Sequence, residues 1–540
     1  MVLGIDLGTT HSCVAYIDET GKPAIISSAM AEDTTPSVVF FESPGSAVVG
    51  RAARNQALVT PELVAQLVKR EMGTDAEYRF HGERHTPETV SALILRELVR
   101  CAEDQTGQQF RDAVITMPAY FGIAEREATM RAGQLAGLNV LDVLAEPVAA
   151  AMHYRSLGGG ASTHEPRYIL IYDLGGGTFD TTVIRLDGDD VTVVCTDGEA
   201  RLGGADWDQA IASYLLDQVK AAHPGIQPEQ DPQFMQDLLI SAERLKRELS
   251  TTQARRHIMR FDGRVTQVEL TRAKVEDLTA DLLERTVQVT ERAIATAHRK
   301  GVADFDEVLL VGGMSRFPAV ARVLKERFGF DARQHEPELA VAKGAAQFAL
   351  LRTVRRGGNG TADSPEAVAA RLGMSVPEVQ RLAATRVATV VPHAFGVKGI
   401  DGRDPLAVTD PVNARQIVVH LLPANTPLPA DTGPYPFHTV IDNQRMVGVE
   451  VWEQAGPQES EDLAENRKVG EGILRNLPPR LPARTQIEIT FFMSETGLLT
   501  VHATGPGLDT DLHFDLQIGD LDGAGMEKAR QSVAHYQVSG

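Results

Sequence analysis

The sequence predicts an α/β protein with two similar lobes around one shared cleft, followed by a mainly antiparallel β-sandwich domain. Two short apolar segments each end in Asp-Leu-Gly, at Asp6 and at Asp173. Apolar strands alternate with helices through most of the chain, and alternating β runs dominate after Val387. With 540 residues, of which 43% are hydrophobic, the length allows roughly three or four domains with sizeable cores.

The two Asp-Leu-Gly segments have the same design. In each, an apolar strand leads to the aspartate, a turn follows, and a second strand leaves the turn; the second turn holds three consecutive glycines, 175–177. Glycines let backbone N–H groups approach a phosphate because no Cβ intervenes. A carboxylate at the strand end suits a hydrated Mg²⁺. One such segment alone is typical of an ordinary hairpin, but two in one chain predict two phosphate-facing turns. Neither segment fits the P-loop or the Rossmann pattern, which leaves an actin-like, two-lobed ATPase design.

The remaining elements of the two lobes follow from periodicity and from helix start and stop signals. Before the second hairpin we expect strands over 36–41, 113–121 and 138–144, and helices over 61–72, 86–103, 124–136 and 148–152. After it we expect helices over 205–220, 231–249 and 339–351, with a strand, glycine turn and helix start over 308–318. On the second helix, Glu243, Lys246 and Ser250 share one face, a spacing that also fits an ordinary surface pair.

Residues 354–386 interrupt this pattern. The run 355–360 is linker-like, and two short helices joined at Gly373 follow it. The spacing of Ala369, Gly373 and Val379 resembles a helix-turn-helix. Because short matches are often false and the chain is acidic, a helical-hairpin insert that spaces domains or binds protein is favoured over DNA binding.

From Val387 onward the sequence predicts the sandwich. Alternating runs over 416–421, 446–452, 486–491 and 498–503 are separated by turns rich in Pro and Gly, and a helix over 523–536 ends the chain. The expected domains are therefore 1–353 for the two lobes, 354–386 for the linker and insert, 387–519 for the sandwich, and 520–540 for a short C-terminal helix.

Charge and composition exclude several classes of protein. The formal charge, 53 − 73 = −20, argues against a dominant nucleic-acid function. There is no apolar run of about eighteen residues, which a transmembrane helix needs, and the first strand begins too early for a signal peptide. Cys13, Cys101 and Cys195 lack metal-ligand spacing and are typical of a reducing compartment. We expect a cytoplasmic protein.

Five motifs stand in the order of the heat shock protein 70 family, and the chain resembles the bacterial branch of these ATP-driven chaperones. The motifs are Gly4-Ile-Asp-Leu-Gly-Thr-Thr, Ile115-Thr-Met-Pro-Ala-Tyr-Phe, Glu146-Pro147, Asp173-Leu-Gly-Gly-Gly-Thr-Phe-Asp and Leu202-Gly-Gly-Ala-Asp. The resemblance implies a Mg²⁺-dependent ATPase that uses ATP or ADP, with K⁺ as a further candidate cation. It also implies binding of unfolded client proteins, protein folding and a role in stress.

The same resemblance assigns roles to residues of this sequence. It implies that Lys69 contacts the γ-phosphate and the attacking water, and that Glu146 and Asp173 polarise this water and place the metal, which Asp6 and Asp173 hold through water. It gives the phosphate cradle as Asp6, Gly8, Thr9, Thr10, Gly175, Gly176, Gly177, Thr178, Gly203 and Gly204. It gives the adenosine site as Glu243, Lys246, Ser250, Gly312, Gly313 and Arg316, and a switch as Pro118 with Arg126. Phosphoryl transfer depends mostly on positioning and charge stabilisation, which such a set can supply.

In the β region, the segments 421–429 and 437–444 resemble the family's peptide-binding sandwich. By position, the residues that would line a groove for extended peptides of client proteins are Val397, Ile400, Phe437, Val440 and Val447. Apolar strand residues are more often core, so that alternative stays open. A single helix follows, so we expect a truncated lid.

Three departures from the family pattern define a divergent, lidless member. The linker 387–392 lacks the family's aspartate, and the stretch 72–86 is short, which puts contacts with a nucleotide exchange factor in question. Asp142, Ala145 and Val148 replace the family's Arg, Asn and Thr, and an acidic residue there would repel a J-domain cochaperone. Two hypotheses remain: an ATP-hydrolysing, peptide-binding chaperone, and a nucleotide-gated scaffold or regulatory protein with slow hydrolysis.

Overall fold

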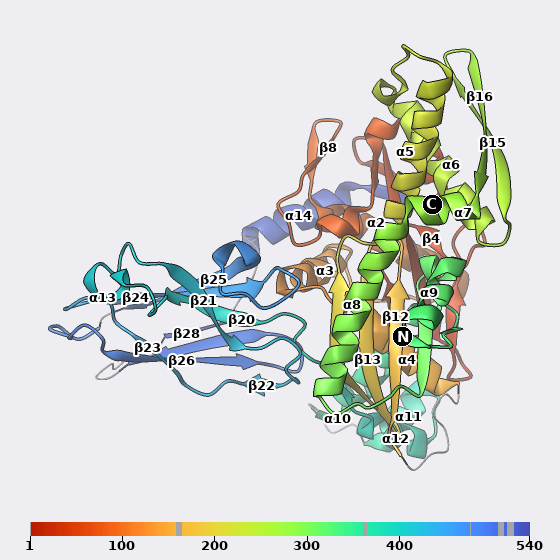
Figure 1. Ribbon diagram of the computed structural model, residues 1–540. Coiled ribbons are helices and arrows are strands. Elements are labelled where there is room, and N and C mark those ends of the chain that lie inside the picture. Colours follow the sequence, from red (N-terminus) through yellow and green to blue (C-terminus); the bar gives the residue numbers. More distant parts are fainter. Residues whose placement is uncertain (1, 158–164, 360–363, 476, 506–511, 516–522) are drawn as a thin grey trace.

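The computed structural model describes residues 2–157, 165–359, 364–475, 477–505, 512–515 and 523–540. It has an α/β body and a β part beside it, and the helix α14 runs from the side of the β part toward the body (Figure 1). The body contains two six-stranded sheets, one for each expected lobe.

The two sheets share a pattern of parallel strands followed by antiparallel hairpins. The lobe I sheet has the order β11 (Asn139–Ala145), β10 (Asp112–Met117), β1 (Val2–Asp6), β2 (His11–Ile17) and β3 (Pro23–Ile26), with β4 (Thr35–Pro36) beside β2. The lobe II sheet has the order β18 (Arg333–Gln334), β17 (Glu307–Val311), β12 (Arg167–Leu174), β13 (Phe179–Asp187), β14 (Asp190–Glu199) and β19 (Val387–Ala388). In each sheet the strand that carries the Asp-Leu-Gly motif is parallel to one neighbour and antiparallel to the other. The two-lobed body predicted from these motifs is present.

Two small-residue helices, α4 (Glu146–Ser156) and α10 (Ala340–Asn359), pack together against the sheets, and their buried side chains join strands of both lobes in one core. Close approach requires glycine here. A Cβ on Gly4 of β1 would overlap the backbone of Ala346, and one on Gly344 would overlap the backbone of Ala149. The other helices are α1 (Arg51–Gln56), α2 (Pro87–Thr106) and α3 (Ile123–Leu135) in lobe I, and α5 (Gly204–Ala222), α6 (Pro232–Leu249), α7 (Arg272–Leu278), α8 (Ala280–Arg299) and α9 (Pro318–Phe328) in lobe II.

The prediction of a helix over 61–72 is wrong. The segment forms a 3-10 turn (Pro61–Leu63), the strand β7 (Val64–Gln66) and a second 3-10 turn (Val68–Glu71). Pairing of β7 with β5 (Val38–Ser43) outweighs the helical spacing, and Leu67 takes a left-handed φ of 58° between the two turns.

The insert is partly as predicted. Helices α11 (Pro365–Leu372) and α12 (Val376–Ala384) meet at Gly373, whose left-handed φ of 67° ends α11. Both pack on α10 through a small apolar cluster that includes Leu350, Ala369 and Val379. The expected linker over 355–360 is instead helical up to Asn359, because α10 continues past Leu351.

The β part consists of two sheets that share one apolar core. The first has the order β21 (Gln416–Leu422), β20 (Phe395–Ile400), β24 (Met446–Gln454) and β25 (Asn466–Arg475). The second has the order β22 (Ala430–Asp431), β26 (Gln486–Met493), β27 (Leu499–Thr504) and β28 (Leu512–Asp515), with β23 (Tyr435–His438) beside β26. The four runs expected from alternation all form strands.

The C-terminal segment packs on lobe I. Helix α14 (Gly523–His535) contacts α2 and α3 of lobe I, and β29 (Gln537–Ser539) adds in parallel to β6 (Ser46–Val49). The small sheet it joins also contains β5 and β7. The short helix expected at 520–540 is present as α14, and the apolar side of this segment is buried in the core of lobe I. In the part of the chain that the structure describes, no helix is long and apolar enough to cross a membrane.

Replacing Gly344 by Ala tests the close contact between α4 and α10. The added methyl group meets the backbone of Ala149, which cannot move aside as a flexible side chain could, so we expect a loss of about 1–3 kcal/mol or more in the free energy of unfolding. Gly402→Ala is the control because a Cβ there meets nothing within 4 Å. The measurement is the thermal unfolding midpoint by circular dichroism. Equal midpoints for the two variants would contradict the packing account.

Candidate functional site

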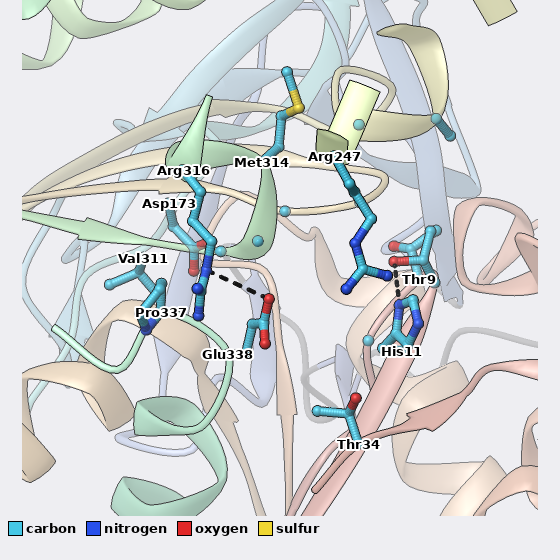
Figure 2. Close-up of a pocket in the computed structure, with 18 of the residues that line it drawn as sticks. Thr9, His11, Thr34, Asp173, Arg247, Val311, Met314, Arg316, Pro337 and Glu338 are labelled. Atoms are coloured by element: carbon cyan, nitrogen blue, oxygen red, sulfur yellow. Dashed lines mark hydrogen bonds and ion pairs between the residues drawn. The ribbon is translucent and has the colours of Figure 1, made fainter. Parts of the chain in front are cut away.

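A cavity of about 700 Å³ lies where the motif strands of the two lobes end, a volume typical of ligand sites. Figure 2 shows side chains from both lobes around it, among them Thr9 and His11 on one side and Arg316 and Glu338 on the other. Most of the predicted site residues line it: Asp6, Gly8, Thr9, Thr10, Lys69, Glu146, Asp173, Gly175, Gly176, Thr178, Gly204, Glu243, Lys246, Ser250, Gly312, Gly313 and Arg316. Gly177 and Gly203 lie behind this lining, and Pro118 and Arg126 lie outside it.

The two Asp-Leu-Gly turns touch each other at the base of the cavity. A Cβ on Gly176 would overlap the side chain of Thr10, and one on Gly177 would overlap Thr9. Gly203 is equally close to the backbone of Gly177. The glycines are therefore required by the approach of lobe I to lobe II, and they leave backbone groups facing the cavity.

The start of α5 and Arg70 fix the glycine turn. The N–H groups of Gly204 and Ala205 donate to the carbonyl oxygens of Gly175 and Gly176, at 2.9 and 2.8 Å. Arg70, in the 3-10 turn of lobe I, donates from Nε to the Gly177 carbonyl (3.0 Å) and from Nη1 to Asp206 Oδ1 (3.1 Å). Arg70 thus ties the lobes together, a role that the sequence reasoning missed although it named the neighbouring Lys69.

Several carboxyl groups with one lysine crowd the inner end of the cavity. Lys69 Nζ donates to Glu146 Oε1 at 2.6 Å, and both side chains are nearly buried. Burial, together with the charge of Glu146, raises the pKa of Asp6 to about 7, although Lys69 and a hydrogen bond from Thr116 oppose this. Burial and the neighbouring carboxylates also raise the pKa of Asp173 well above its usual range.

This arrangement fits a divalent cation. One lysine offsets only part of the negative charge, so a cation between Asp6 and Asp173 would relieve the repulsion and the desolvation that raise both pKa values. Among the described residues, no group of three or more His, Cys, Asp or Glu could hold a metal ion. A hydrated Mg²⁺ needs few protein ligands because it keeps several waters and takes phosphate oxygens.

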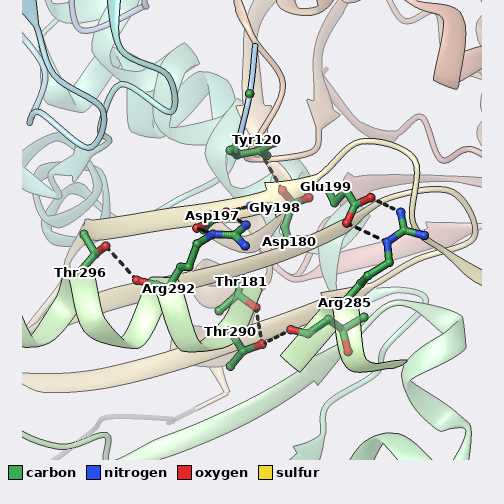
Figure 3. Close-up of polar contacts among 12 residues, drawn as sticks. Tyr120, Asp180, Thr181, Asp197, Gly198, Glu199, Arg285, Thr290, Arg292 and Thr296 are labelled. Carbon is green, nitrogen blue, oxygen red and sulfur yellow. Dashed lines mark hydrogen bonds and ion pairs between the residues drawn. The ribbon is translucent and has the colours of Figure 1, made fainter. Parts of the chain in front are cut away.

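Asp180 is a further carboxyl group that the sequence reasoning quoted within the motif but gave no role. It pairs across the β12–β13 hairpin with Asp173, and its Oδ1 accepts a hydrogen bond from the Tyr120 N–H at 2.9 Å. Burial is the main cause that raises its pKa to about 8. Figure 3 shows Asp180 beside Tyr120, with the ion pairs Asp197–Arg292 and Glu199–Arg285 on neighbouring parts of β14 and α8. Asp180 thus connects the hairpin to the segment after Pro118.

The outer side of the cavity is formed by α6 and by the turn after β17. Lys246 is buried and donates to the Gly204 carbonyl at 2.7 Å, and its Nζ lies 2.8 Å from Asp208 Oδ1. Glu243 forms an ion pair with Arg54 of lobe I, which closes the cleft on this side. Ser250 ends α6 and donates to the Lys246 carbonyl at 3.1 Å. The sequence reasoning missed Asp208 and Arg54, which carry no motif.

Arg316 and the two glycines lie on the opposite wall. Gly312 has a left-handed φ of 80°, and a Cβ there would overlap the Leu174 carbonyl. Its N–H donates to the Pro337 carbonyl at 2.8 Å. Arg316 is half exposed, and its Nε lies 3.5 Å from Glu338.

The predicted switch residues belong to the boundary between lobe I and the β part. Pro118 directly follows β10, and its carbonyl accepts from the Phe121 N–H at 3.2 Å. Arg126 donates to the Val143 carbonyl at 2.6 Å and to Asp142 Oδ1 at 2.8 Å, while Arg352 binds the other oxygen of Asp142. Asp142 is therefore buried and paired, and the predicted repulsion of a J-domain loses its basis in a free surface charge.

The five residues predicted to bind peptide differ in exposure. Val397 is 2% exposed and belongs to the core shared by the two β sheets, so its side chain is not available to a ligand in this conformation. Phe437 and Val447 are half-buried against that core, Ile400 is half-buried, and Val440 is exposed. The alternative of ordinary core packing therefore holds for Val397.

One comparison with known protein families bears on this cleft. A family model described as Hsp70 protein matches residues 2–80 and 74–359. The matched residues include both Asp-Leu-Gly turns, Lys69, Glu146 and the helices around the cavity. They make up more than half of the chain, which therefore belongs to the Hsp70 protein family.

Proposed function

We propose that this protein is an ATP-dependent, chaperone-like ATPase that binds extended apolar peptide segments in residues 387–519 under control of the nucleotide held by residues 1–353. The family supports a chaperone-like, ATP-binding function. The observation that carries the proposal is the contact between the two Asp-Leu-Gly turns, with the buried Lys69–Glu146 pair at the same cavity.

In this proposal the two turns hold the phosphates of ATP or ADP. Backbone groups of 8–10, Gly175 and Gly176, with the hydroxyl of Thr178, face the phosphate chain, and Lys69 balances the charge of the terminal phosphate. Glu146, held by Lys69, orients the attacking water. When bound, Mg²⁺ supplies neutralisation of phosphate charge, and Asp6 and Asp173 are the residues that would hold it. Arg316 and α6 would take the adenosine.

Two groups of contacts support communication between the nucleotide and the β part. The linker strand β19 adds to the edge of the lobe II sheet beside β14, and the Arg386 N–H donates to Asp190 Oδ1 at 2.7 Å. Arg467 of β25 reaches lobe I, where Nη1 lies 2.7 Å from Glu125 Oε1, and Nη2 binds Glu453 at 2.7 Å. The β part is thus in contact with both lobes.

A nucleotide-gated scaffold with slow hydrolysis is the second candidate. The helices α11 and α12 favour it, because their packing on α10 places an added surface directly on the nucleotide lobes. A cytoplasmic location stays a prediction from the sequence.

Replacing Lys69 by Ala tests the proposed chemistry. The change removes the cation beside the terminal phosphate, so we expect kcat for ATP hydrolysis to fall by about 10²-fold or more, with a smaller effect on ADP affinity. Single-turnover hydrolysis and ADP titration calorimetry measure the two quantities. The matched control is Lys22→Ala on the exposed surface of lobe I. An unchanged single-turnover rate in Lys69→Ala would sink the proposed role.

The crowded carboxyl groups predict a pH dependence of nucleotide binding. Without a cation, Asp6 with its pKa of about 7 holds a proton in more acidic solution, whereas a metal ion binds only the carboxylate. Binding of Mg²⁺-ADP should therefore release protons below about pH 7, and affinity should fall as pH decreases, by up to about tenfold per pH unit for each displaced proton. Calorimetry in two buffers of different ionisation enthalpy measures the release. Proton release that Asp6→Asn leaves unchanged would contradict this assignment.

Peptide control of hydrolysis separates the two candidate functions. We expect an extended apolar peptide to change the steady-state ATPase rate, and Val440→Asp to weaken this effect because a charge enters an exposed apolar position of the proposed groove. Val265→Asp, at an exposed apolar position on the strand β16 (Arg264–Thr271) of lobe II, is the control. A rate that no peptide alters, with ATP still bound, would favour the scaffold.

A further inference from the structure

The C-terminal tail, defined here as residues 523–540 with α14 and β29, is built into lobe I. Val533 and Tyr536 are each 2% exposed and belong to the apolar core of that lobe. The Tyr536 ring meets the Phe41 ring edge-on, with centroids 5.7 Å apart, and lies beside His85. Because aromatic side chains bury a large apolar area, burial of Tyr536 stabilises the contact between the tail and lobe I.

Polar contacts fix the same segment at three points. Arg96 of α2 donates from Nη1 to the carbonyl oxygens of Val533 and Tyr536, at 2.5 and 3.0 Å, and so satisfies groups at the end of α14. The Tyr536 hydroxyl donates to Glu83 Oε2 at 2.5 Å. The Gln537 N–H donates to the Gly45 carbonyl at 2.8 Å, where β29 pairs with β6. These contacts hold a defined strand register, beyond apolar contact alone.

Because the C-terminal tail follows the β part in the chain, its packing on lobe I attaches the end of the β part to that lobe. The β part follows β19, which is paired to the edge of lobe II, and its last described strand, β28, ends at Asp515. Only residues 516–522 separate Asp515 from Gly523, where α14 begins. A connection of this length spans roughly 30 Å at most. The β part is therefore held at both ends, by lobe II at its start and by lobe I at its end.

We infer that the C-terminal tail is a tether that retains the β part on the nucleotide lobes. Among the described residues, the β part meets lobe I at Ile123, which packs into the apolar core of the β part, and at polar contacts such as Arg467–Glu125 and the Ile123 N–H to Glu453 Oε1 at 3.2 Å. Contacts between domains of one chain permit relative motion by default unless the interface is large and hydrophobic. A second covalent connection restricts the separated state and raises the effective concentration of the two surfaces for each other. The tether thus favours the docked arrangement without adding a contact to the proposed peptide groove.

The test uses a substitution that weakens the pairing of β29 with lobe I and leaves the buried side chains of the core unchanged. Gln537 is exposed, and its backbone N–H makes the bond to Gly45. Gln537→Pro removes this donor, whereas Gln537→Ala keeps it and is the matched control. Spin labels at Gln109→Cys in lobe I and Arg475→Cys on β25 report the distance between lobe I and the β part; both positions are exposed, and the three native cysteines are buried. Hydrogen exchange of the amides of β29 reports whether the tail has separated from lobe I.

We expect full-length protein and Gln537→Ala to give one narrow distance distribution, without nucleotide and with ADP. Gln537→Pro should give a longer, broader distribution together with faster exchange in β29. Deletion of 523–540 is the second variant and should have the same effect. If hydrogen exchange shows that β29 stays paired with lobe I in Gln537→Pro, the deletion variant provides the test. Unchanged distances in a variant whose tail is released or deleted would overturn the inference, as would a broad distribution in the unmodified protein. Because the readout needs no hydrolysis, its failure is distinguishable from failure of the proposed ATPase, which nucleotide calorimetry on the same samples reports.

Discussion

The contact between the two Asp-Leu-Gly turns is the constraint on which the rest of the structure depends. Thr9 and Thr10 of lobe I lie where a side chain on Gly177 or Gly176 would have to be. This contact forces both turns to present backbone to the same cavity and places the strand-end carboxyl groups, Asp6 and Asp173, on one face of it. The close packing of α4 on α10, again made possible by glycine, holds the two sheets at the separation that this contact needs.

The same contact has an electrostatic cost that points to the ligand. Buried carboxyl groups converge with a single lysine, and the resulting desolvation and repulsion raise the pKa values of Asp6, Asp173 and Asp180. A protein selected only for stability gains nothing from this cluster, because unpaired buried carboxylates are unfavourable. A divalent cation with a phosphate chain relieves the repulsion and makes use of the backbone groups nearby. The site is thus arranged for a bound state in which these charges are balanced.

Sequence reasoning predicted the parts of the fold in which local pattern and tertiary packing agree. Examples are the two motif hairpins, the helix α2 and the alternating strands from Gln416 onward. The segment 61–72 was mispredicted because pairing of β7 with β5 leaves no trace in helical periodicity. Arg70, Asp208 and Arg54 were missed because each acts through a residue distant in the sequence. The seat of the C-terminal tail on lobe I could not be read either, since a helix with one apolar side fits any complementary surface.

The linker strand β19 pairs with the lobe II sheet before the β part, and the tail strand β29 pairs with lobe I after it. Under the proposed function, a ligand that changes how the lobes meet acts on both attachments. A double-mutant cycle of Asp6→Asn and Asp173→Asn on Mg²⁺-ADP affinity tests most directly whether the two turns form one site. If they share one cation and one phosphate chain, the double variant should lose less than the sum of the single losses, with a coupling of about 1 kcal/mol or more. Losses that add within about 0.5 kcal/mol would show two independent turns and contradict the account.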